Sequence, residues 1–323
     1  MKRYALVLCF CGAQIGLATH AFAQNFPSKP FRILSTFTAG AVADAAIRLV
    51  AQKMSDSVGQ PVIVEAMTGA GGVLAAQILV RSAPDGYTLL HCAPTTLVAT
   101  PFILKNPPYD PLKDFTYITH MADATLSIVV ANSLPVNTVK EMIDYAKTYP
   151  GKLAYGSNGI GASAHLEMEL LKLKYGIDVI HVPYKGGAEG LNAAAAGQVP
   201  MAFAPLISAA QQAKAGKVRI IAVTSVKRFP GLPEYPSMGE QLPDYEKIPT
   251  GDEIVGPAGI PAAIVRRLNA EMVKAINHPE TVERLRSIGF VGVANSPEEH
   301  LAQIKRDMQI MAKAIKAARI NPE

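Results

Sequence analysis

Short β-branched runs alternate with longer helical stretches along this chain, and that alternation limits the folds it can adopt. The first runs of strand character are Phe31–Phe37, Pro61–Glu65 and Tyr87–Cys92. Stretches of helical period, at 44–57 and about 72–82, separate them. Strands that alternate with helices in this way predict βαβ units, in which helices cover both faces of a parallel sheet.

The same rhythm restarts at Leu126–Ala131, which predicts a second α/β block. Two extended crossings between the blocks, near 126–131 and 253–257, favour a clamshell in which the middle segment is inserted into the N-terminal domain. In open α/β folds of this kind, ligands bind beyond the carboxyl ends of the strands. We therefore expect one lobe from residues 25–125 plus 253–323, and a second lobe from residues 126–252.

The first 23 residues have the pattern of a secretory signal peptide. A positively charged start precedes an apolar run, Ala5–Leu17, and residues 21–23, Ala-Phe-Ala, form an A-x-A cleavage site. The apolar run is shorter than the roughly 20 residues that a transmembrane helix needs. The alternative is a retained membrane helix. We expect a signal peptide at residues 1–23, export, and a mature protein in a bacterial periplasm.

Charge and cysteine content narrow the class of protein. The formal net charge of +5 falls to +3 without Lys2 and Arg3, and the remaining basic residues are scattered. A nucleic-acid-binding surface would need a basic stripe. Of the three cysteines, only Cys92 lies beyond the signal peptide, and a lone thiol forms no internal disulfide. We expect a monomer with no nucleic-acid partner.

Three loops rich in small residues each lie between a predicted strand and a predicted helix. They span residues 36–44, 69–72 and 156–163, and the third is the most polar. Small residues let a ligand approach backbone N–H groups closely, and the N–H groups and dipole at a helix start attract anions. Two such loops from opposite lobes could hold a dicarboxylate without any arginine. The alternative is that the glycines form tight turns and that Asp44 and Ser163 are ordinary N-caps.

Motifs of catalysis and metal binding are absent from the sequence. It contains no G-x-S-x-G, no H-x-x-x-H and no C-x-x-C. Gly159-x-Gly161-x-x-Ala164 resembles a dinucleotide fingerprint, but no acidic residue ends the next predicted strand. We therefore expect no cofactor and no metal. Cys92 with His181 is the thiol–imidazole pair that an enzyme could use, whereas a lone buried cysteine commonly serves packing.

Several short motifs follow one another in a particular order. They read PSKP at 27–30, GQPV at 59–62, GAGG at 69–72, APDGYTLL at 83–90, YDPLKDF at 109–115 and HVPYKG at 181–186. This set resembles the Bug/TctC family, the periplasmic solute-binding proteins of tripartite tricarboxylate transporters. The resemblance covers essentially the whole mature chain. It implies a type II periplasmic-binding fold that closes like a flytrap, no catalysis, and a small organic acid held by loop N–H groups, hydroxyls and waters.

The pocket loops depart from the family pattern in ways that bear on the ligand. Ala162 stands where the family usually has a hydroxyl residue, and Gly251 and Asp252 stand where it has an aromatic pair. With fewer donors, less aromatic bulk and new carboxylates, we expect a roomier pocket that takes a bulkier acid or an acid bearing a cationic group. The alternative is that Asp252 and Glu253 face solvent.

The sequence thus predicts an α/β, two-lobed flytrap receptor with two crossover strands. It would capture a carboxylate for uptake by the permease of a tripartite transporter. The alternatives are a ligand-presenting partner of a membrane receptor kinase and a periplasmic enzyme that uses Cys92. Asp44 and His165 are expected to brace the loops. The residues expected to contact ligand are Thr38, Ala39, Gly40, Thr95, Thr96, Ser157, Asn158, Gly159, Ser163 and Asp252.

Overall fold

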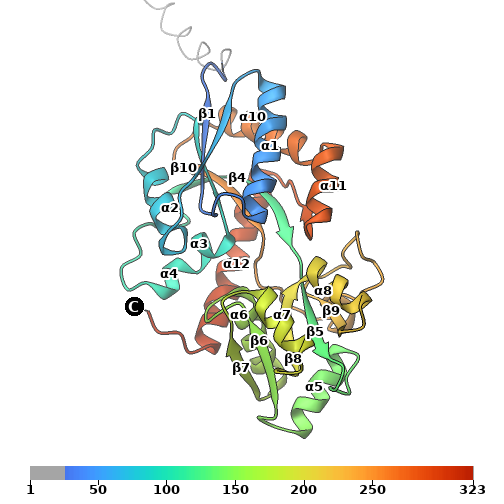
Figure 1. The fold of residues 1–323 in the computed structure, drawn as a ribbon. Helices are drawn as coiled ribbons and strands as arrows, with labels where there is room; N and C mark the ends of the chain where they lie inside the picture. Colours follow the sequence, from blue (N-terminus) through green and yellow to red (C-terminus); the bar gives the residue numbers. More distant parts are fainter. Residues whose placement is uncertain (1–25, 323) are drawn as a thin grey trace, which may run out of the picture.

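The computed structural model describes residues 26–322 as two α/β lobes, each built around its own sheet (Figure 1). The alternation of strands and helices predicted from the sequence is confirmed in both lobes. The predicted signal peptide, residues 1–23, lies outside the described residues.

The first sheet has six strands in the order β11-β4-β10-β3-β1-β2. β1 runs parallel to β2 and β3, as βαβ units require. β10 pairs antiparallel with β3 and β4, because the chain returns along it from the other lobe. The strands are β1 (Phe31–Ser35), β2 (Val62–Ala66), β3 (Thr88–Cys92), β4 (Phe115–Ala124), β10 (Asp252–Pro257) and β11 (Phe290–Gly292).

Helices cover both faces of this sheet. α1 and α10 bury apolar residues such as Ile47 and Leu268 against one face, and α2 and α12 bury Leu79 and Ile304 against the other. Each such side chain contributes roughly 1.5–3 kcal/mol when fully buried. The helices are α1 (Val42–Val58), the 3-10 turn η1 (Ala70–Gly72), α2 (Val73–Val80), α3 (Pro94–Val98), α4 (Thr100–Ile103), α10 (Ala262–Ile276), α11 (Pro279–Ser287) and α12 (Pro297–Ala317).

The second sheet has five strands in the order β7-β6-β8-β5-β9. α5 and α6 pack on one face around Tyr155 and Phe203, and α7 and α8 cover the other. Within residues 26–322, no helix combines the length and apolar character needed to cross a bilayer. The elements are β5 (Leu126–Ala131), α5 (Val139–Thr148), β6 (Leu153–Ser157), α6 (Ser163–Tyr175), β7 (Val179–Pro183), α7 (Gly187–Ala195), β8 (Met201–Pro205), α8 (Leu206–Lys214), β9 (Val218–Val223) and α9 (Met238–Gln241).

Two features join the lobes closely. Only Thr125 separates β4 from β5, so the chain passes from the first sheet to the second within one residue. Helix α12 packs beside α6, and Leu166 and Leu170 of α6 share an apolar cluster with Ile304 and Met311 of α12. The last helix therefore belongs to the core of the first lobe and also contacts the second lobe.

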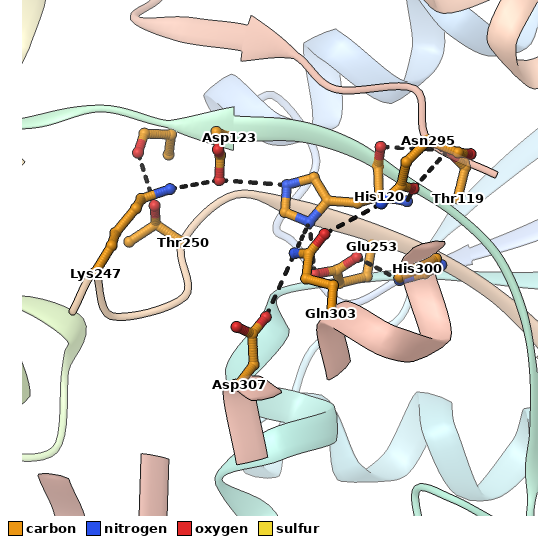
Figure 2. Close-up of polar contacts among 11 residues, drawn as sticks. Thr119, His120, Asp123, Lys247, Thr250, Glu253, Asn295, His300, Gln303 and Asp307 are labelled. Carbon is orange, nitrogen blue, oxygen red and sulfur yellow. Dashed lines mark hydrogen bonds and ion pairs between the residues drawn. The ribbon is translucent and has the colours of Figure 1, made fainter. Parts of the chain in front are cut away.

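Glu253 of β10 is buried beside the crossings, between two histidines (Figure 2). Its Oε1 lies 2.9 Å from His120 Nδ1, and its Oε2 lies 2.7 Å from His300 Nε2. His120 Nε2 lies 3.4 Å from Asp123 Oδ1, and Asp123 also pairs with Lys247. Strand β4, strand β10 and helix α12 thus meet at one carboxylate, and the alternative that Glu253 faces solvent is wrong.

Glu253 and His120 are both charged at neutral pH. Burial opposes ionisation of Glu253, but the charges of His120 and His300 outweigh it and hold the pKa of Glu253 well below its usual value. Burial likewise opposes protonation of His120, yet Glu253 and Asp123 raise the pKa of His120 to about 10. Removing one member of such a pair leaves a buried charge uncompensated, which costs about 3–5 kcal/mol.

The His120–Glu253 pair should make the free energy of unfolding depend on alkaline pH. The pKa of His120 rises from 6.5 to about 10 on folding. Its contribution is therefore fully present below pH 6.5 and is lost as the pH rises toward 10. The full shift corresponds to roughly 5 kcal/mol. Denaturant titrations between pH 6.5 and pH 9.5 should show a steeper loss of stability for the native chain than for His120→Gln.

The matched control is His278→Gln, because His278 is exposed and lies outside the Glu253 cluster; its Nδ1 accepts from Glu280 N at the start of α11, so the variant loses only this capping hydrogen bond. This variant should keep the pH profile of the native chain. If His120→Gln lost stability across that range as steeply as the native protein, the ion pair would not carry the effect.

Candidate functional site

A cavity of about 740 Å³ is lined by residues of both lobes. The first lobe contributes Phe37 and residues of η1, α2, α3 and α4, and the second contributes Leu126 and the loop before α6. The crossing segment contributes residues 249–252, and the turn after α12 contributes Ile320 and Asn321. A ligand held here would touch both lobes at once, and concave sites between lobes are common places for small molecules to bind.

Four of the residues predicted to contact ligand line this cavity. Thr95 comes from α3, Asn158 from the loop after β6, and Ser163 is the first residue of α6. Asp252 begins β10 in the crossing segment. The structure thus brings together polar side chains from both lobes and from the crossing.

The other six predicted contact residues do not line the cavity, because local hydrogen bonds or exposure turn them elsewhere. Residues 38–40 are exposed, and Phe37 lines the wall beside them. The Thr96 hydroxyl is buried and donates to Gly71 O at 2.9 Å. Ser157 Oγ lies 2.6 Å from His181 Nε2 and accepts from Gly159 N at 3.1 Å. The six are Thr38, Ala39, Gly40, Thr96, Ser157 and Gly159.

In both lobes, a side chain of the following helix holds the loop that leads to the cavity. Gly40 N donates to Asp44 Oδ2 at 2.9 Å, and Arg48 Nε donates to the same oxygen at 2.9 Å. The hydrogen bond from Arg48 holds the pKa of Asp44 below its usual value. In the second lobe, Gly161 N donates to His165 Nδ1 at 3.0 Å. Both glycines have positive φ, +82° and +76°, which favours glycine there.

The imidazole of His165 stacks on that of His181, with ring centroids 4.1 Å apart. Burial lowers the pKa of His165. Burial and the charge of a protonated His165 lower the pKa of His181 to about 4. Both rings are therefore neutral at neutral pH, and Nδ1 of His165 keeps the lone pair that accepts the Gly161 N–H.

Helices α1 and α6 begin beside the cavity without a side-chain cap. Their N-cap residues are Ala41 and Ala162, so the alternative that Asp44 and Ser163 are ordinary N-caps is wrong. Helix α12, by contrast, is capped by Ser296. Uncapped N–H groups at a helix start, together with the helix dipole, favour an anion. The helix starts at the cavity wall thus keep donors for a ligand.

Asp252 is 1% exposed, so the alternative that it faces solvent is wrong. Neither carboxyl oxygen of Asp252 has a hydrogen-bond partner among the described residues, and Oδ2 lies 3.5 Å from His91 Nε2. The preceding Gly251 has φ +108°, and a Cβ there would come within 1.9 Å of Ala122 O. Only glycine fits at this position, which fixes Asp252 where the crossing strands meet.

Sequence reasoning missed several residues of the wall. Phe290 of β11 and Ile320 and Asn321 after α12 line the cavity, although they lie more than 120 residues from the polar loop at 156–163. Arg319, at φ +53°, turns the chain after α12, and Ile320 N donates to Ile315 O at 3.2 Å. The sequence offers no signal for these contacts, because no loop motif marks these positions.

The geometry does not assemble the thiol–imidazole pair of an enzyme. Cys92 lies on β3 of the first sheet, whereas His181 lies on β7 of the second. Burial and the carboxylates of Glu253 and Asp252 raise the pKa of the Cys92 thiol, so the reactive thiolate is disfavoured. Within residues 26–322, no group of three histidine, cysteine or acidic side chains is placed to hold a metal ion.

Comparison with known proteins places these features in a family context. The model of a family described as tripartite tricarboxylate transporter family receptor matches residues 46–320. A Cupriavidus necator protein, described as the UPF0065 protein in the gbd 5' region, is 38% identical over 279 residues. That match covers 84% of this chain and 83% of the relative.

Two solved structures share the fold over nearly the whole chain. An R. palustris protein solved with adipate has a TM-score of 0.73 and 30% identity, and the match covers 92% of this chain and 100% of that one. MatC from Rhodopseudomonas palustris, with bound malate, has a TM-score of 0.69 and 26% identity, over 90% of this chain and 100% of its own. The predicted two-lobed periplasmic-binding fold is therefore confirmed.

Replacing His165 should loosen the loop before α6. In His165→Ala the Gly161 N–H loses its acceptor, so we expect the free energy of unfolding to fall by about 1–2 kcal/mol. Hydrogen exchange of the Gly161 amide, followed by NMR, should become faster. His278→Ala removes an exposed histidine and should leave that amide unchanged. Equal exchange of Gly161 in both variants would show that His165 does not hold the loop.

Proposed function

This chain belongs to the tripartite tricarboxylate transporter receptor (TctC) family, and on that basis we propose that it captures a small organic acid between its lobes. It delivers the acid to the permease of a tripartite tricarboxylate transporter and catalyses no reaction. The signal-peptide pattern of residues 1–23 supports export, and we propose the periplasm as its location.

The proposal rests on one observation: α1 and α6, two helices that begin without a side-chain cap, contribute residues of their first turns to a cavity that both lobes line. Ala43 in the first turn of α1 lines the cavity, as do Ala162 and Ser163 at the start of α6. Each helix start supplies N–H donors and a partial positive charge, which suit a carboxylate. The adipate and malate of the two related structures are carboxylates of this kind.

The binding cycle follows from a ligand that contacts two lobes. We propose that residues 25–125 plus 253–323 move as one unit and residues 126–252 as the other. A ligand that bridges the units stabilises the closed state only by the contacts it gains beyond binding to one lobe. The permease then distinguishes a closed, loaded receptor from an open, empty one.

A thermal-shift series tests the proposed function. The mature protein is mixed with hexanoate, adipate, malate, citrate and 3-phenylpropanoate, and each acid is paired with its uncharged amide. At least one acid should stabilise the folded state, by about 2.7 kcal/mol at 100 times its dissociation constant. The matching amide should give a much smaller shift, because the helix-start donors favour an anion.

Asn158→Ala removes a cavity-lining amide and should weaken binding of that acid by roughly tenfold, since a lost hydrogen bond to a charged group costs about 1.5–3 kcal/mol. Asn137→Ala, at an exposed position outside the cavity, should bind as the native protein does. If amides stabilised the protein as well as acids, or no acid did, anion capture would be contradicted.

A further inference from the structure

We infer that the acid this receptor selects has a single carboxylate and a bulky apolar body. The inference rests on the proposed function and narrows its ligand class. It follows from the chemistry of the cavity wall, which is poor in charge and rich in large apolar side chains.

The apolar part of the wall comes from many separate elements of the chain. Loops, helices and strands of both lobes each contribute at least one large apolar side chain, so these side chains line the cavity from several directions. A ligand with an apolar body covers this wall and removes it from water, which favours binding. A small polar ligand leaves the wall exposed to water and lacks this gain. This apolar wall includes Phe37, Ile103 and Phe290 from the first lobe and Leu126, Ile160 and Leu166 from the second.

The charged part of the wall is a single side chain. Asp252 is the only acidic or basic side chain among the described residues that line the cavity, and lysine, arginine and histidine are absent from that set. The remaining polar side chains are hydroxyls and amides, such as Thr95, Asn158, Ser163 and Asn321. One carboxylate can take its donors from these groups and from the start of α6.

A second carboxylate has no comparable place in this cavity, because the first turn of α1 already contains the carboxylate of Asp44, which accepts from Gly40 N. It would leave water for an apolar wall, and an ion that loses its hydration without a partner is strongly disfavoured. The ionisable residue of the cavity wall, Asp252, has a carboxyl group, so it cannot supply the cation that a second carboxylate would need. Burial of a methyl or phenyl group in the same position is favourable because its apolar surface leaves water, and each buried methylene raises affinity roughly fourfold. The wall therefore favours a monoacid over a diacid of equal length.

Matched pairs of acids test this inference by isothermal titration calorimetry. Hexanoate and adipate have the same carbon chain and differ by one carboxylate. Similarly, 3-phenylpropanoate and succinate share a propanoate unit but differ in the group at its end. We expect hexanoate to bind at least about tenfold more tightly than adipate, and 3-phenylpropanoate more tightly than succinate, malate or citrate.

A pair of variants ties the preference to the wall. Ile160 is 73% exposed and lines the cavity, so Ile160→Ala removes apolar contacts without touching the core. We expect it to weaken 3-phenylpropanoate binding by at least about threefold while leaving the melting temperature of the empty protein unchanged. Ile180 on β7 is 50% exposed and lies outside the cavity. Ile180→Ala should bind 3-phenylpropanoate as the native protein does.

The outcomes separate this inference from the proposed function. If adipate, succinate, malate or citrate bound more tightly than the matched monoacid, the receptor function would stand and the inference would be overturned. If none of these acids bound, both would fail. Equal losses of affinity in Ile160→Ala and Ile180→Ala would show that the apolar wall does not make the selection.

Discussion

A carboxylate buried between two imidazoles connects the strands and the helix that meet where the two lobes are joined. Glu253 pairs with His120 of β4 and with His300 of α12, and its own strand, β10, is the second crossing (Figure 2). The neighbouring residue, Asp252, lines the cavity between the lobes. Because these ions are buried, separating them would leave uncompensated charges, so the distances between Glu253 and the two imidazoles must be maintained.

The wall of the cavity next to this cluster carries little charge: among the described residues that line it, Asp252 is the only acidic or basic one. Helices α1 and α6 begin at the wall without side-chain caps, and Asp44 and His165 hold the preceding loops through Gly40 and Gly161. The uncapped N–H groups at these helix starts could hold an anion without the desolvation cost of a buried arginine. A receptor must also release its ligand, and neutral donors suit that need better than a buried ion pair, whose separation is costly.

The sequence was sufficient for most of the elements and for part of the site, but it did not predict α3, α4, β4 or β11. Alternating periodicity predicted both α/β blocks, and small-residue loops led to Asn158 and Ser163 at the cavity. Gly40 and Gly159 do not line the cavity, and the positive φ and local hydrogen bonds that turn their loops cannot be read from composition. Phe290, Ile320 and the partners of Glu253 come from elements far apart in the chain, so their proximity depends on tertiary packing that no local pattern encodes.

In the proposed complex, backbone amides at the start of α6 meet the carboxylate of a ligand that also touches the first lobe. An NMR titration of the mature, ¹⁵N-labelled protein with 3-phenylpropanoate tests this directly. The amides of Ser163 and Ala164 should shift downfield and saturate together with those of the Thr95 region in the first lobe. Saturable binding that left the Ser163 and Ala164 amides unmoved would contradict the account.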